Sequence, residues 1–214
     1  MKVCDFMSTI LILGYEAFSA LLPLMLAFMI LKTAAKKKGS SFSRGRFLAL
    51  IVFSLYIIGV YYVTGAGTLY DGLRFKPELR HTQINLLPFS RDIDIVAYLL
   101  NIVLFVPLGL LIPLIWKKMN KPGRVLGVGF LFTLLIELSQ LLNHRATDID
   151  DAILNVFGAA VGFGLFKLWD KLTKARFRVE SPVTAELFIC IFVAFAGRFL
   201  LYNEMGLAKL IYGF

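Results

Sequence analysis

Residues 95–116 read IVAYLLNIVLFVPLGLLIPLIW, a continuous apolar run without a charged side chain. A helix rises about 1.5 Å per residue, so this run is long enough to cross a hydrocarbon core of about 30 Å. A helix also satisfies all of its backbone hydrogen bonds within the segment, which lipid requires. The stretch therefore predicts a transmembrane helix.

Comparable runs recur along the chain, and the composition agrees with them. Hydrophobic residues make up 58% of the 214 residues and charged residues 17%, which excludes a soluble enzyme, a disordered chain and a secreted disulfide scaffold. We expect an all-α integral membrane protein, a polytopic bundle of about six transmembrane helices forming a single membrane domain over residues 1–214. The expected spans are Thr9–Leu31, Phe47–Thr64, Ile95–Trp116, Val125–Leu142, Ala152–Trp169 and Val183–Leu201.

The distribution of positive charge predicts the orientation of these spans. Fifteen of the 23 basic residues lie in the alternate connections 32–46, 117–124 and 167–178. Because cytoplasmic loops are enriched in Lys and Arg, we expect both termini to be extracellular. The net charge of +9 is then a property of the topology, and no nucleic-acid partner is expected.

Polar side chains within the predicted spans gather at one depth. Helical rise places six of them in the outer third of the membrane, roughly 5–12 Å deep. They are Glu16, Asn101, Glu137, Gln140, Asn155 and Arg198. Ionisable groups at such depths are costly and usually functional. Glu137, Gln140 and His144 also share one helical face.

The span Ala152–Trp169 carries a narrow stripe of polar and small residues. Its members, spaced i, i+4, i+7 and i+11, are Asp151, Asn155, Gly158 and Gly162. Two glycines four residues apart permit close helix approach, so the stripe is expected to face another helix. Thr147 or Asp148 can cap this helix, and Asp150 and Asp151 can complement its dipole. We expect the polar residues to line one cavity that opens outward, with Arg145 and Asp148 at its rim.

Four motifs occur in a fixed order: NLLPF at 85–89, NIVLFVPLG at 101–109, ExxQ at 137–140 and RxxDIDDxxxNxxG at 145–158. The set resembles the VanZ-like family, most strongly over 84–166 and more weakly over 47–170. This resemblance implies a multi-pass protein of the bacterial cytoplasmic membrane, linked to resistance to teicoplanin-type lipoglycopeptide antibiotics. Carried over to this chain, the polar positions of the family are the candidate binding residues Asn85, Asn101, Glu137, Gln140, Arg145, Asp148, Asp151 and Asn155.

The resemblance and the depth of the polar groups favour a binding site for an amphiphile at the outer leaflet. The expected partners are membrane lipids and either a lipoglycopeptide antibiotic or a cell-wall lipid precursor, with the head against the polar groups and the tail among the spans. No cofactor is expected. An enzyme acting on a lipid head group is the alternative, with Glu137 as acid or base and Arg145 holding a phosphate. That reading lacks a Ser or Cys nucleophile beside a base.

Three further interpretations stay open. The acidic turn can simply cap a helix, with Arg145 neutralising one carboxylate in a polar core that only fixes helix packing. A transporter needs polar groups along a route to the inner face, and the inner halves of the predicted spans have few. A divalent cation on Glu137, Asp148, Asp150 and Asp151 has suitable oxygen ligands, but their spacing fits no known loop, so no metal site is expected.

Overall fold

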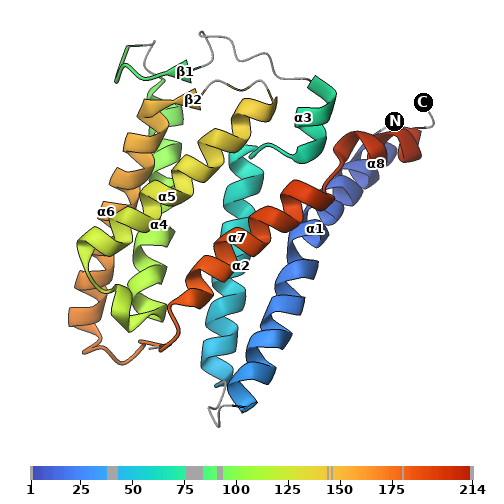
Figure 1. Ribbon diagram of the computed structural model, residues 1–214. Coiled ribbons are helices and arrows are strands. Elements are labelled where there is room, and N and C mark those ends of the chain that lie inside the picture. Colours follow the sequence, from blue (N-terminus) through green and yellow to red (C-terminus); the bar gives the residue numbers. More distant parts are fainter. Residues whose placement is uncertain are drawn as a thin grey trace.

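The computed structural model describes residues 2–37, 43–75, 84–90, 94–143, 145, 147–179 and 181–212. Within them, five helices are long and apolar enough to span a membrane, and α7 and α8, which meet at a 44° bend, form a sixth such segment if counted together (Figure 1). The prediction of a polytopic helical membrane protein is confirmed. The elements are α1 (Lys2–Lys37), α2 (Arg44–Thr64), α3 (Leu69–Phe75), β1 (Ile84–Asn85), α4 (Ile95–Ile115), η2 (Lys117–Met119), α5 (Pro122–Gln140), η3 (Leu141–Asn143), β2 (Thr147–Asp148), α6 (Ile149–Leu172), α7 (Ala185–Leu201) and α8 (Glu204–Tyr212).

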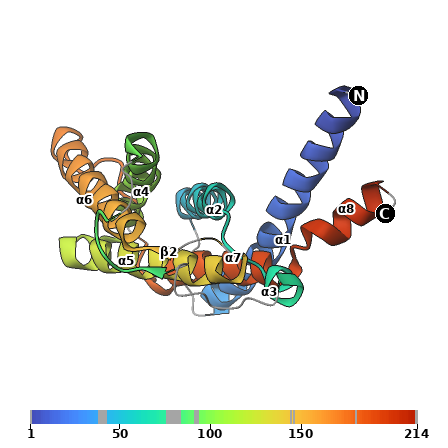
Figure 2. The same cartoon turned by 90° about the horizontal axis from the view of Figure 1, so that it is seen from above.

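The helices form two groups joined by α2. Helices α4, α5 and α6 pack together, α1 packs along α7, and α2 lies between the two groups (Figure 2). The N-terminal end of α1 and the C-terminal end of α8 lie at the same end of the molecule as α3 and the β1–β2 pair (Figure 1). The adjoining ends of α1 and α2, of α4 and α5, and of α6 and α7 lie at the opposite end. We call these the terminal end and the basic end.

Helices α4 and α6 approach so closely that their backbones touch. A Cβ atom added at Gly158 would overlap the carbonyl oxygen of Ile102, and one added at Gly162 would overlap that of Val106. Only glycine leaves room for such an approach. The prediction that the stripe on this helix faces another helix is therefore confirmed.

Aromatic packing around α2 ties the two groups of helices together. The buried ring of Tyr61 meets the edge of Phe132 on α5 at a centroid distance of 5.4 Å. Its hydroxyl donates to the carbonyl oxygen of Ile191 on α7 over 2.9 Å. One side chain thus packs against one group and hydrogen-bonds to the other, which fixes the position of α2 between them.

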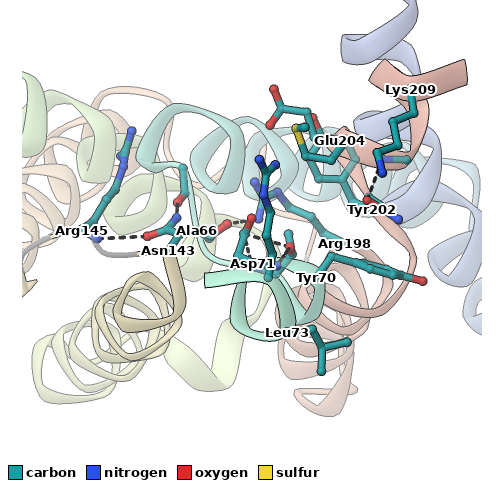
Figure 3. Close-up of a pocket in the computed structure, with 16 residues that line it drawn as sticks. Ala66, Tyr70, Asp71, Leu73, Asn143, Arg145, Arg198, Tyr202, Glu204 and Lys209 are labelled. Atoms are coloured by element: carbon teal, nitrogen blue, oxygen red, sulfur yellow. Dashed lines mark hydrogen bonds between the residues drawn. The ribbon is translucent and has the colours of Figure 1, made fainter. Parts of the chain in front are cut away.

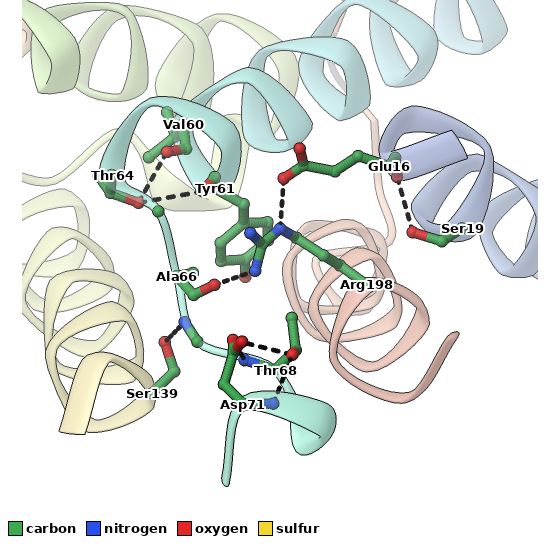
Figure 4. Close-up of polar contacts among 12 residues, drawn as sticks. Glu16, Ser19, Val60, Tyr61, Thr64, Ala66, Thr68, Asp71, Ser139 and Arg198 are labelled. Atoms are coloured by element: carbon green, nitrogen blue, oxygen red, sulfur yellow. Dashed lines mark hydrogen bonds and ion pairs between the residues drawn. The ribbon is translucent and has the colours of Figure 1, made fainter. Parts of the chain in front are cut away.

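Two buried ion pairs hold α7 at its ends. At the basic end, the Arg46 guanidinium pairs with Glu186, whose carboxylate also accepts from the Ser181 hydroxyl over 2.6 Å. At the terminal end, Arg198 Nε donates to Glu16 Oε1 over 2.7 Å (Figure 4). Buried charges are tolerated when they are paired in this way.

Candidate functional site

A hydrogen-bonded network surrounds the first turn of α6. Asp148 caps the helix, because its carboxylate accepts from the amide of Asp150 over 3.1 Å. The same carboxylate accepts two bonds of 3.2 Å from the Asn85 amide across the parallel β1–β2 pair. The backbone amide of Asp148 donates to Glu137 Oε2 over 3.3 Å. Of the two expected caps, Thr147 and Asp148, the structure shows Asp148, which also joins three segments of the chain.

The polar stripe on α6 continues the network between the helices. Asp151 Oδ1 accepts from the Asn101 amide of α4 over 2.5 Å. One turn further on, the buried amide of Asn155 donates to Thr133 Oγ1 on α5 over 2.8 Å, and Asn155 Oδ1 has no partner among the described residues. We use the name carboxylate network for Asn85, Asn101, Glu137, Asp148, Asp150, Asp151 and Asn155.

Acidic groups in this network lie close together without a cation. Glu137 is 5% exposed and Asp150 is 2% exposed, and Asp148 and Asp151 both repel the Glu137 carboxylate. Among the described residues, no basic side chain forms an ion pair with Glu137, Asp150 or Asp151. Uncompensated buried charge is expensive, so such groups are retained in proteins mainly where they have a function. The site is therefore rich in hydrogen-bond acceptors.

The segment from Ile84 to Ser90 is fastened over this network. Its Phe89 has a left-handed backbone (φ 54°), which is rare for a bulky residue, and its amide donates to Asp150 Oδ1 over 2.8 Å. The Tyr98 hydroxyl donates to the other oxygen of Asp150 over 2.5 Å. Because of this anchoring, Leu86 and Leu87 project outward and are each 70% exposed. An apolar surface thus lies directly beside the acceptor-rich network.

Two predicted site residues serve a different location, the C-terminus of α2. The amide of Gln140 and the guanidinium of Arg145 both donate to the carbonyl oxygen of Thr64, over 2.7 and 2.6 Å. Gly65 ends the helix in the left-handed conformation (φ 60°), and the Asn143 amide donates to its carbonyl oxygen over 2.9 Å. Cationic and amide donors complement the negative end of a helix dipole.

Arg198 completes this cap from the other side. Its Nη1 donates to the carbonyl oxygen of Ala66, while its Nε holds Glu16 (Figure 4). Glu16 and Arg198, predicted as separate members of one polar layer, are thus partners in an ion pair that borders the end of α2.

A cavity of about 710 Å³ opens beside this cap. Arg145 and Asn143 line one side of it, and α3, the end of α7 and α8 line the rest (Figure 3). Of the eight predicted site residues, only Arg145 lines this cavity. Its lining residues are Gly65, Ala66, Thr68, Tyr70, Asp71, Leu73, Arg74, Asn143, Arg145, Arg198, Tyr202, Asn203, Glu204, Met205, Gly206 and Lys209.

The structure therefore divides the predicted site. Asn85, Asp148 and Glu137 form one connected chain of hydrogen bonds, and Asn101 with Asp151 forms a second contact on the same helix end. Asn155 lies one turn deeper, whereas Gln140 and Arg145 cap α2. The Arg145–carboxylate pairing considered from the sequence is not found among the described residues.

Sequence reasoning missed two contributors to this site. Tyr98 lies three residues before Asn101 on the same face of α4, and that spacing was an available signal. Asp150 was expected to complement a helix dipole and was considered as a cation ligand, whereas in the structure it anchors both Phe89 and Tyr98. The predicted neighbour His144 lies outside the described residues. Within the described ranges, no group of three or more His, Cys, Asp or Glu side chains is arranged to hold a metal ion.

Comparison with known proteins adds one finding. The chain gives no match among curated proteins or among solved structures. The profile of the VanZ/LLP1 family matches residues 24–170, about two thirds of the chain, from the middle of α1 to the end region of α6. This range contains the carboxylate network and the Arg145 cap. The chain therefore belongs to the VanZ/LLP1 family.

Proposed function

We propose that this protein protects bacteria against teicoplanin-type lipoglycopeptides by binding an amphiphile at the terminal end of the bundle. In this proposal the protein lies in the cytoplasmic membrane with both termini outside, so the terminal end meets the outer leaflet. The amphiphile is the drug itself or a cell-envelope lipid.

The observation that carries the proposal is the pairing of a polar site with an apolar one. Glu137 and the half-buried Asp151 supply acceptor oxygens without a basic partner among the described residues. Such oxygens suit a head group rich in donors, as peptide N–H and sugar hydroxyl groups are. The exposed side chains of Leu86 and Leu87 lie beside them and suit an acyl tail.

The apolar surface extends onto the first turns of α4. Ile95 and Val96 are each 67% exposed, and Leu99 is 56% exposed. In a membrane these side chains face acyl chains in any case, so a ligand tail entering from the bilayer meets no desolvation barrier. The tail and head of one amphiphile can therefore contact neighbouring surfaces without rearrangement of the helices.

An expression-matched resistance assay with teicoplanin and vancomycin tests this proposal. Vancomycin lacks the acyl tail, so we expect protection against teicoplanin and much weaker protection against vancomycin. Glu137→Gln and Asp151→Asn keep side-chain volume and remove charge, and each should abolish protection while the protein level stays largely intact. Lys36→Ala, at the basic end, is the matched control and should protect as wild type does.

Three results would argue against the proposal. Equal protection against both drugs would exclude recognition of an acyl tail, and full activity of both acidic-site variants would remove the carboxylate network from the function. Recovery of a cleaved or modified drug or lipid by mass spectrometry would favour the alternative, an enzyme acting on a lipid head group.

A further inference from the structure

The cavity of about 710 Å³ is separate from the carboxylate network, because no residue of that network lines it. We propose that this cavity binds a phosphate-bearing anion, either the head group of an anionic lipid or free phosphate. This inference stands on different residues from the proposed function, and neither depends on the other.

Positive charge is concentrated at this cavity. The sequence leaves few basic residues at the terminal end, since most lie in the three connections at the basic end. The basic side chains that the structure describes at the terminal end are Arg74, Arg145, Arg198 and Lys209, and all four line the cavity. Arg198 is paired with Glu16, and Asp71 and Glu204 also line the wall, so the net positive charge comes from Arg74, Arg145 and Lys209. This excess favours an anionic ligand.

Two guanidinium groups are held in fixed positions on the cavity wall (Figure 3). Arg145 donates from Nη1 to Thr64, and Arg198 donates from Nη1 to Ala66, so the two groups flank the backbone of Gly65. The Arg145 guanidinium also lies on Gly65, where an added Cβ would come within 2.8 Å of its Cζ.

The N–H groups that these contacts leave unused indicate what kind of ligand the cavity can bind. Arg145 donates from Nη1 and Arg198 donates from Nε and Nη1, and neither Nη2 has a hydrogen-bond partner among the described residues. Arg145 has no carboxylate partner in the same ranges. A guanidinium that is already fixed at one edge loses little entropy when its free N–H groups bind phosphate oxygens.

Two acidic side chains, Asp71 and Glu204, also line the cavity and oppose an anionic ligand. The Asp71 carboxylate accepts from both the amide and the hydroxyl of Thr68, each over 2.8 Å, so it is held at the start of α3 (Figure 4). Glu204 is exposed and has no such partner among the described residues. Removing the charge of Glu204 should therefore strengthen anion binding. If Glu204 only stabilised the fold, its removal would not strengthen binding.

The rim of the cavity also offers apolar contact. Leu73 on α3 is 66% exposed, and Leu210 on α8, next to the lining residue Lys209, is 82% exposed. A lipid would use these side chains for its acyl chains, whereas free phosphate would not. If the natural ligand is a lipid, the cavity should therefore bind the anionic lipid more tightly than free phosphate.

The test titrates the purified full-length protein in dodecyl maltoside and follows the midpoint of thermal unfolding. The probes are inorganic phosphate, dioleoyl phosphatidylglycerol, and dioleoyl phosphatidylcholine with the same acyl chains but no net charge. We expect saturable stabilisation by phosphatidylglycerol and little by phosphatidylcholine. Tighter binding of phosphatidylglycerol than of phosphate identifies a lipid site, and equal binding identifies a free-phosphate site. Stabilisation by neither anion, or equal stabilisation by both lipids, overturns the proposal.

Variants connect any binding to this cavity. Arg145→Gln should weaken phosphatidylglycerol binding about tenfold, and Lys209→Gln about threefold, because a flexible ammonium binds phosphate as a point charge and a guanidinium binds it bidentately. Glu204→Gln should strengthen binding about threefold, and Lys36→Gln at the basic end should have no effect. Lys209 and Glu204 make no internal hydrogen bond among the described residues, so their variants stay informative if Arg145→Gln loosens the α2 cap. Unchanged affinity in all three cavity variants, or weaker binding by Glu204→Gln, would refute the assignment.

Discussion

Replacing Gly162 by alanine tests the α4–α6 interface with a single methyl group. A Cβ at this position would overlap the carbonyl oxygen of Val106 and approach the Cα of Gly109. Both obstacles are backbone atoms that no rotamer change can move, so the two helices must separate. A separation of about 1 Å forfeits roughly a quarter to a half of the dispersion energy of the contacts involved.

The expected cost follows from two opposing terms. Overpacking of this kind costs about 1–3 kcal/mol, and alanine returns up to about 1 kcal/mol through its higher helix propensity. With the full gain in helix propensity, we therefore expect Gly162→Ala to lower the free energy of unfolding by up to about 2 kcal/mol. The separation should also lengthen the 2.5 Å bond between Asn101 and Asp151, so teicoplanin protection should fall as well.

Gly164→Ala is the matched control. It lies two residues further along the same helix, and a Cβ there meets no atom within 4 Å. Its variant gains the same helix propensity without a packing penalty, so it should be as stable as wild type or more stable. The assay is equilibrium unfolding in mixed dodecyl maltoside and dodecyl sulfate micelles, followed by circular dichroism. If the variants at Gly162 and Gly164 are equally stable, the close-packing argument is wrong.

Three further outcomes are expected. Asn101→Ala should cost about 1–2 kcal/mol of unfolding free energy, because Asp151 loses a donor; an unchanged unfolding curve would contradict this. Glu16→Ala and Arg198→Ala should each cost about 3–5 kcal/mol, and the double variant clearly less than their sum, since each single change leaves a buried charge without its partner; additivity in a double-mutant cycle would argue against the pair. In a variant without the native cysteines, a cysteine at Lys36 should react with an impermeant maleimide only after cells are opened; labelling of intact cells would reverse the proposed orientation.

The spans and the helix-facing stripe were predictable from the sequence because both are local patterns. Hydropathy located every long helix, and the four-residue spacing of Gly158 and Gly162 correctly indicated a close helix contact. The cap at Asp148 was predictable for the same reason, since it depends on neighbouring residues alone. These features need no knowledge of which helices are neighbours.

The division of the candidate site was not predictable, because it depends on contacts between distant segments. Gln140 and Arg145 share the depth and sequence neighbourhood of Glu137, yet both donate to Thr64, 76 and 81 residues away. Depth along a helix axis does not say on which side of the bundle a residue lies. The final span differed for a related reason: the sequence pattern Val183–Leu201 does not reveal the bend that joins α7 to α8.

The parallel pairing of β1 with β2 has a consequence for biogenesis. Ile84 pairs with Thr147, and the two helices α4 and α5 lie between them in the chain. A nascent chain that ends before Thr147 therefore has no partner for β1, and the amide of Phe89 has no Asp150 to bind. The NLLPF segment can be fastened only after the α4–α5 hairpin has been inserted and the first turn of α6 has emerged. Pairing of β1 with β2 is thus a late step in assembly, and it follows membrane integration of α4 and α5.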